Sequence, residues 1–137
     1  MANYKSGVAR RNAAVDAMAT RLNSGKIEVR AGAQPTNITD ASTGNLLAEL
    51  TYGATAFGAA SNGTATANAI ASDTNAPNSG DAGYFREYAS GAADTAADGE
   101  GDCGESADSP DLEFDNKTIV AGGTVAISSL TLSMPEQ

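Results

Sequence analysis

The spacing of hydrophobic and polar positions changes near residue 25. Before that point the larger apolar residues fall at helical spacing, on one stripe formed by Val8, Val15, Met18 and Leu22. Ser6 can cap the start of a helix, and residues 23–25 (NSG) provide an exit with a glycine available for a left-handed turn. The pattern predicts one amphipathic helix. Two interpretations stay open: the helix packs on the protein's own sheet, or it is presented to a partner.

Beyond residue 25 the apolar period becomes two, which is typical of strands with one solvated face. Residues 26–31 (KIEVRA) and 46–52 (LLAELTY) predict two strands. In residues 57–71, a turn at 61–63 leads into a long, thin strand of alternating threonine and alanine. Residues 83–90 (GYFREYAS) predict a further strand, with Tyr84, Arg86 and Tyr88 on one face and Phe85 and Glu87 on the other. Which of these faces is buried stays open.

The C-terminal residues 111–134 continue the strand pattern through turns at 115–116 and 122–123. The apolar parity changes across Ser128 and Ser129, where a β-bulge would return Leu130 and Leu132 to the core side. Six or seven short strands after one helix predict an all-β fold, an antiparallel, jelly-roll-like β-sandwich with one N-terminal α-helix. We expect a single domain over 1–137, with the helix or arm in 1–24 and the sandwich in 25–137.

Composition indicates a thin core, because aromatic residues make up only 5% of the chain and tryptophan is absent. Small side chains bury little apolar surface, at about 25 cal/mol per Å². Docking or self-association would add to this burial. We therefore expect a homo-oligomer, a dimer or a trimer.

Charge is distributed unevenly along the chain. Residues 1–30 carry six basic and two acidic side chains, a balance of +4, which leaves −13 for residues 31–137 out of a total of −9. An acidic body disfavours nucleic-acid binding, and no apolar run approaches the roughly 18 residues of a membrane span. The basic segment is either the charged face of a helix or a contact for an acidic partner. The residues concerned are Lys5, Arg10, Arg11, Arg21, Lys26 and Arg30.

Residues 94–111 (DTAADGEGDCGESADSPD) raise two chemical possibilities. GEGDCG at 99–104 matches G-x-G-x-x-G, but neither a buried strand before it nor a helix after it is predicted, and its acids would repel a phosphate. Asp98, Glu100 and Asp102 match positions 1, 3 and 5 of a calcium loop, whereas Cys103 and Ser109 stand where an EF-hand needs glycine and an acid. We expect a mobile acidic surface loop over 91–110.

Catalytic groups are scarce in this sequence. Histidine is absent, which removes the commonest general base, and Cys103 lies among carboxylates that raise the pKa of a thiol. Paired carboxylates would need an aromatic-lined cleft for glycoside chemistry, which seven aromatic residues cannot supply together with a core. We expect no catalytic residue, no cofactor and no metal site, and therefore no enzyme.

The order of several segments resembles small virion structural proteins of tailed bacteriophages and prophages. These segments are RNAAVDAM, GAQP, LLAELTYGATAFGAASNGTATANAIASD, GYFREYAS and DLEFDNKTIVAGGTVAISSLTL. The resemblance implies a capsid cement or head-decoration protein that lies on the capsid exterior, binds the major capsid protein and links its neighbouring subunits. Such a chain would be made in the host bacterial cytoplasm. The stretch 91–110 departs from the pattern. The alternative is a tail or fibre component that binds a receptor or a carbohydrate.

Overall fold

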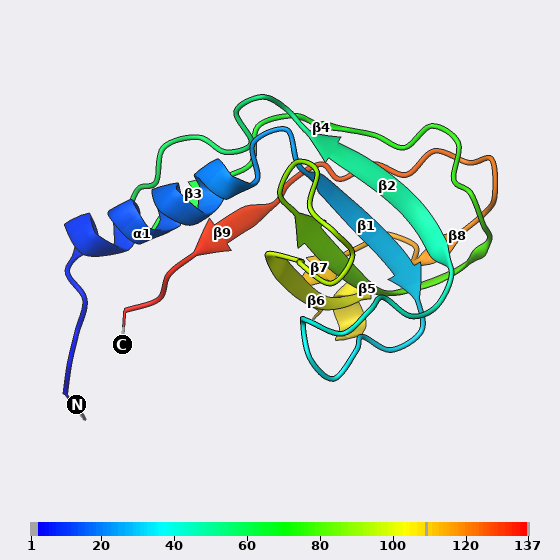
Figure 1. The fold of residues 1–137 in the computed structure, drawn as a ribbon, viewed down its shortest axis with the longest axis horizontal. Coiled ribbons are helices and arrows are strands. Elements are labelled where there is room, and N and C mark those ends of the chain that lie inside the picture. The colour runs from blue at the N-terminus through cyan, green and yellow to red at the C-terminus, as the bar shows by residue number, and fades with distance from the viewer. Residues whose placement is uncertain (1–2, 109, 137) are drawn as a thin grey trace.

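The computed structural model describes residues 3–108 and 110–136. Within these residues, one helix is followed by short strands and one 3₁₀ turn, so the prediction of a mostly β protein with an N-terminal helix is confirmed (Figure 1). The helix is α1 (Val8–Arg21). The strands are β1 (Lys26–Ala31), β2 (Leu46–Tyr52), β3 (Thr64–Thr66), β4 (Ile70–Ala71), β5 (Gly80–Tyr88), β6 (Gly99–Gly104), β7 (Leu112–Glu113), β8 (Thr118–Ile119) and β9 (Thr131–Ser133), and the 3₁₀ turn is η1 (Ser106–Asp108).

The main sheet curls in the order β4-β2-β1-β5-β6-β7, with β8 also paired to β5. It is mixed and not wholly antiparallel as expected, because β6 and β7 run parallel after the chain turns through η1 between them. A separate two-stranded sheet joins β3 and β9 beside α1. Both chain termini lie at the same end of the long axis, beyond α1 and β9 (Figure 1).

The hydrophobic core lies on one face of the curled sheet and continues beneath α1. Ile27 and Val29 of β1 face Leu50 and Ala48 of β2 in the register of the antiparallel pair, and all four are fully buried. Much of the remaining core is alanine, as the composition suggests; the buried alanines are Ala19, Ala48, Ala56, Ala65, Ala76 and Ala82.

Two details of the helix ends differ from the prediction. The N-cap is Gly7 and makes no side-chain capping bond, so Ser6 does not cap the helix. At the exit, Ser24 takes the left-handed conformation with φ 54°. Gly25 is needed for a different reason, since a Cβ atom there would overlap the carbonyl oxygen of Tyr88. The chain therefore turns tightly from α1 into β1.

Helix α1 packs on the protein's own body. Val15, Ala19 and Leu22 are buried, and three polar side chains hold the segment 56–63 against the helix. Asn12, Asp16 and Asn23 accept backbone N–H groups from Gly63, Ala60 and Ala56 at 2.7, 2.8 and 2.9 Å. Asn12 and Asp16 are one turn apart on the same face of α1, and Asn23 follows in the exit turn, so this face of the helix is occupied. Of the residues that the structure describes, only 3–7 precede the helix.

The threonine–alanine stretch is not one long strand. It forms only β3 and β4, which belong to different sheets, because side chains this small do not fix a single register. The bulge expected at Ser128 and Ser129 is also wrong, since the chain leaves the main sheet after β8, makes an isolated bridge from Val125 to Asp73, and joins β3 as β9. Leu130 and Leu132 nevertheless pack half-buried against the core, as predicted.

The acidic stretch 91–110 is not the free surface loop that we expected. Residues 99–104 form β6, which pairs antiparallel with β5 from Gly99 opposite Glu87 to Asp102 opposite Tyr84. Gly101 permits this pairing, because a Cβ atom there would lie 2.9 Å from the Phe85 ring and 2.7 Å from the Asp111 carboxylate. The glycines of the GEGDCG string therefore serve packing within a strand.

Candidate functional site

The six predicted partner-binding residues do not form one basic surface. Lys5 and Arg10 are exposed at the start of α1, and the Arg10 guanidinium lies 5.5 Å from the centre of the Tyr4 ring. Arg11 is half-buried, and its Nε atom is buried without a hydrogen-bond partner among the described residues. Arg21 forms an ion pair with Asp98 at 2.8 Å, which raises the pKa of Arg21.

Lys26 and Arg30 are brought together on the outer face of β1, on either side of Glu28. Lys26 contacts Glu28 at 2.8 Å and Glu49 of β2 at 3.1 Å, and Arg30 contacts Glu28 at 3.0 Å. Partial burial lowers the pKa of Lys26, but its bonds to the two glutamates outweigh this and raise the pKa overall. These two cations are thus neutralised within the sheet, and Lys5 and Arg10 remain the cations directed to solvent at the tip of α1.

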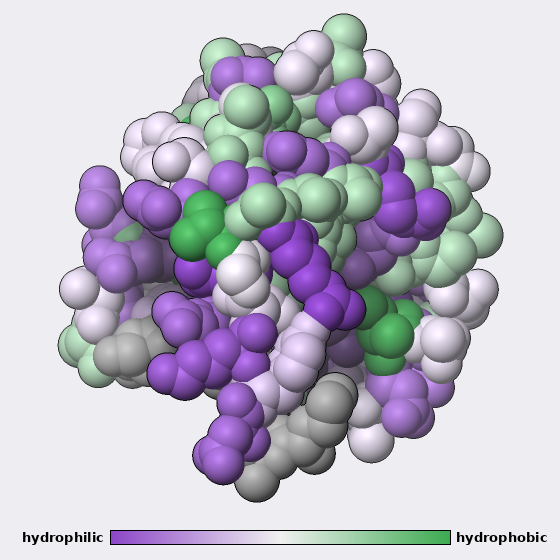
Figure 2. Space-filling model, turned by 90° about the vertical axis from the view of Figure 1, so that its left-hand side faces the viewer, coloured by the Kyte–Doolittle hydropathy of each residue, from purple (hydrophilic) through white to green (hydrophobic). Residues whose placement is uncertain are grey.

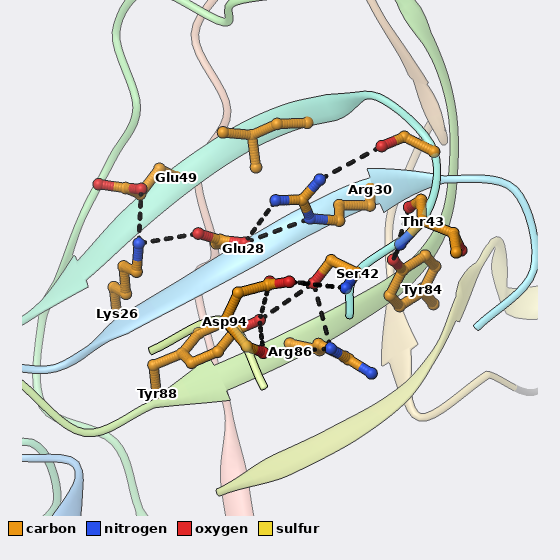
Figure 3. A network of polar contacts seen from close by, with 12 residues as sticks. Lys26, Glu28, Arg30, Ser42, Thr43, Glu49, Tyr84, Arg86, Tyr88 and Asp94 are labelled. Carbon is orange, nitrogen blue, oxygen red and sulfur yellow. Dashed lines mark hydrogen bonds and ion pairs between the residues drawn. The ribbon is translucent and has the colours of Figure 1, made fainter. Parts of the chain in front are cut away.

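Arg86 of β5 is the centre of a polar network on that same outer face (Figure 3). Its side chain is fully buried and its Nε donates to Glu100 of β6 at 2.9 Å. Its Nη1 donates to the carbonyl oxygen of Asp40 at 2.8 Å and to Ser42 Oγ at 3.2 Å. Its Nη2 has no partner among the described residues. Arg86 thereby joins β5, β6 and the 32–45 loop.

Two tyrosines on the same strand hold the covering loops in place. Tyr84 Oη donates to the carbonyl oxygen of Thr43 at 2.6 Å and accepts its N–H at 2.9 Å. Tyr88 Oη donates to Asp94 at 3.1 Å. The Ser42 hydroxyl and backbone N–H both donate to Asp94 and lower the pKa of that carboxyl. Both faces of β5 are therefore covered. This answers the question of which face of the strand is buried.

The acidic residues of 94–102 have separate structural partners. Asp94 is bound by Ser42, Asp98 by Arg21, Glu100 by Arg86, and Asp102 by the N–H of Asp111. Among the described residues, no group of three or more His, Cys, Asp or Glu side chains is placed to hold a metal ion. Asp98, Glu100 and Asp102 do not assemble the oxygen cage that their spacing suggested; the loop's Ser109 lies outside the described residues.

Burial makes Cys103 a poor nucleophile. Its thiol is half-buried on β6, and burial together with Asp102 and Asp111 raises its pKa to about 12. The thiolate is the reactive form. The direction of the shift is the one that the surrounding carboxylates predicted, although burial contributes most of it.

Glu87 is a half-buried acid on the core side of β5. Its Oε1 accepts a hydrogen bond of 2.5 Å from Tyr52 Oη, and it lines a small hollow of about 150 Å³ together with Met18, Leu22 and Leu132. Burial raises the pKa of Glu87, the bond from Tyr52 opposes this, and the nearby Asp98 raises it further. Glu87 has a nearby structural partner in Tyr52 and serves the packing of α1 on the sheet.

The surface at the tip of α1 is mainly hydrophilic. Figure 2 views the molecule from this end, and the strongly hydrophobic colour is confined to small, separate spots. The large exposed hydrophobic residues of the described chain are Tyr4, Val8, Ile38 and Val120. Tyr4 and Val8 share the tip with Lys5 and Arg10, which makes it a mixed cationic and apolar surface. Helix α1 itself is neither long nor apolar enough to cross a bilayer.

No protein-family model, curated protein or solved structure matches this chain.

Proposed function

We propose that this protein is a capsid cement or decoration protein, which binds the outside of a tailed-phage head and stabilises contacts between major capsid subunits. The supporting observation is the tip formed by Tyr4, Lys5, Val8 and Arg10, where exposed cations lie beside exposed apolar side chains. A surface of this kind suits an acidic, partly apolar partner, because the apolar area supplies affinity and the charges supply orientation.

The arrangement of the polar groups favours a role in assembly over a role in catalysis. Arg86 of β5 pairs with Glu100 of β6 and holds the 32–45 loop through the carbonyl oxygen of Asp40. Glu28 is paired with Lys26 and Arg30 on its own strand. A protein that acts by covering part of a partner's surface needs a rigid contact surface and no catalytic groups. The proposal includes a homo-oligomer on the capsid exterior and a jelly-roll-like sandwich as the docked fold.

The test measures binding to heads assembled from the major capsid protein encoded in the same genome. The variant Lys5→Gln/Arg10→Gln removes two positive charges from the tip. We expect it to raise the Kd for heads, measured by co-sedimentation, by about 30-fold, since each of the two lost interfacial charge contacts costs on the order of 1 kcal/mol. The matched control is Thr36→Asp/Thr39→Asp, which changes the net charge equally on the exposed 32–45 loop.

Equal binding by both variants would refute the role of the tip, and failure of the wild-type chain to bind heads would refute the capsid proposal itself. Gold-labelled antibody against the chain, viewed on intact virions, gives an independent answer. Label on heads is expected, whereas label on tails would establish the alternative of a tail or fibre component.

A further inference from the structure

An open groove lies in the C-terminal part of the chain, at the far end of the molecule from the tip of α1. Residues 114–120 form one wall and residues 123–126 the other, and the chain turns between them at 121–122. The groove has a volume of about 410 Å³. Its apolar lining includes Phe114, Ile119 and Val125, and a smaller hollow of about 100 Å³ extends it along residues 126–129.

The outer side of each wall is hydrogen-bonded, and two further amides of the walls have partners: Thr118 N–H donates to Asn116 Oδ1 and Gly123 N–H to the carbonyl oxygen of Val120, both at 2.9 Å. β8 pairs with β5 through Ile119 and Gly80, and Val125 exchanges two bonds with Asp73 at 2.7 and 3.0 Å. Backbone groups in extended chains alternate in direction, so the amides on either side of Val125 point the other way, toward the groove. Neither Thr124 nor Ala126 makes a backbone hydrogen bond among the described residues.

This pairing pattern leaves room for one more strand. The 123–126 wall is an extended edge with unpaired backbone groups at Thr124 and Ala126 beside the apolar side chains of the groove, and these are the features that β-strand addition uses. Main-chain bonds supply affinity, and alternate side chains of the added strand enter the groove. The exposed acids Glu113 and Asp115 at its edge favour a positively charged strand.

The N-terminal arm, residues 3–7, has the matching chemistry. It lies outside the helix, its residue Gly7 is already extended with φ −63° and ψ 157°, and it carries an exposed aromatic ring on Tyr4 next to the cation Lys5. Five extended residues span about 16 Å. The arm and the groove lie at opposite ends of the long axis (Figure 1), so an arm can reach only the groove of a different molecule.

We propose that the groove binds the N-terminal arm of a second copy of this chain as an added β-strand. Tyr4 packs onto the floor at Phe114 and Val125, and Lys5 lies beside Glu113 and Asp115. The contact joins different surfaces of two copies, so it gives a reciprocal pair, a ring or an open chain of copies according to the rotation between them. It requires no capsid and therefore goes beyond the proposed function. When the arm is seated in a groove, Val8 and Arg10 on the helix remain exposed at the tip for the capsid contact.

Disulfide trapping tests the proposal with the full-length chain. In a Cys103→Ala background, one variant carries Asn3→Cys in the arm and a second carries Ala126→Cys on the groove wall. Both positions are exposed, and the arm keeps Tyr4 and Lys5. After mixing at high concentration and mild oxidation, we expect the mixed disulfide at about tenfold higher yield than for the control pair Asn3→Cys with Thr36→Cys, whose loop lies outside the groove.

Charge reversal and mass measurement complete the test. Adding Glu113→Lys/Asp115→Lys to the Ala126→Cys variant is expected to lower the trapping yield to that of the control pair. The wild type at about 1 mM is expected to have the mass of an oligomer by light scattering, and deletion of residues 2–6 is expected to return it to monomer. Equal yields for the two cysteine pairs, or a monomeric wild type, would overturn the inference, and neither result depends on capsid binding.

Discussion

Replacement of Arg86 by methionine is expected to destabilise the fold severely. Arg86 is fully buried, and its loss removes the ion pair to Glu100 and the hydrogen bonds that hold Asp40 and Ser42. The side chain of Glu100 is only 10% exposed, so it would be left as a buried, unpaired charge. Breaking a buried pair from one side costs about 3–5 kcal/mol.

The expected loss corresponds to a large fall in melting temperature. For a chain of this length, 1 kcal/mol shifts Tm by about 3–5 °C, so Arg86→Met should lower Tm by about 10–20 °C. Circular dichroism on heating measures this. The matched control is Arg21→Met, which removes the same type of side chain from an ion pair at a site where it is 66% exposed, and which should change Tm far less.

A double mutant separates the charge effect from the loss of packing. Arg86→Met/Glu100→Gln no longer contains the orphaned carboxylate, so it should recover part of the loss, with a coupling of about 1–3 kcal/mol between the two sites. If Arg86→Met melts within a few degrees of Arg21→Met, the network does not hold the loops in the manner described, and the buried arginine must be solvated in solution.

Three further predictions follow from single positions. Gly83→Ala should destabilise by about 3 kcal/mol in chemical denaturation, because its Cβ would overlap the carbonyl oxygen of Gly32, while Gly58→Ala, with ordinary contact at 3.8 Å, should not. Cys103, with a pKa of about 12, should react with iodoacetamide at pH 8.5 about 10³-fold more slowly in the folded than in the denatured chain; equal rates would contradict this. Because the pKa of Glu87 is raised on folding, wild-type stability should fall as pH rises above about 4.5, and Glu87→Gln should abolish that fall in a series of melting curves.

Strands with large alternating side chains were predictable from the sequence. The segment 26–31 matches β1 and 46–52 matches β2, because each carries an unbroken row of bulky apolar residues that only one face of a sheet can bury. The prediction of one long strand in 57–71 was wrong for the opposite reason. Alternating threonine and alanine favour extended chain but do not fix a partner, so tertiary contacts decided which sheet each piece joined.

The acidic stretch 94–102 shows that local sequence does not predict which distant residues will pair with a segment. Glycine and aspartate both disfavour strands, and nothing near residue 99 indicates that Arg86 and Arg21 will neutralise Glu100 and Asp98 from other elements. A signal was present for the helix, since Asn12 and Asp16 lie one turn apart on the same face and indicate that this polar face is occupied. The basic surface was overestimated because counting cations ignores the acids that pair with them.

The position of both termini at one end of the molecule has a practical consequence for the assays of capsid binding and self-association. A purification tag or fluorescent fusion at either terminus would crowd Tyr4 and Lys5 and mimic the loss of binding that the variants are designed to reveal. An epitope inserted near Thr36, on an exposed loop away from that end, would label the protein without touching the tip or the groove.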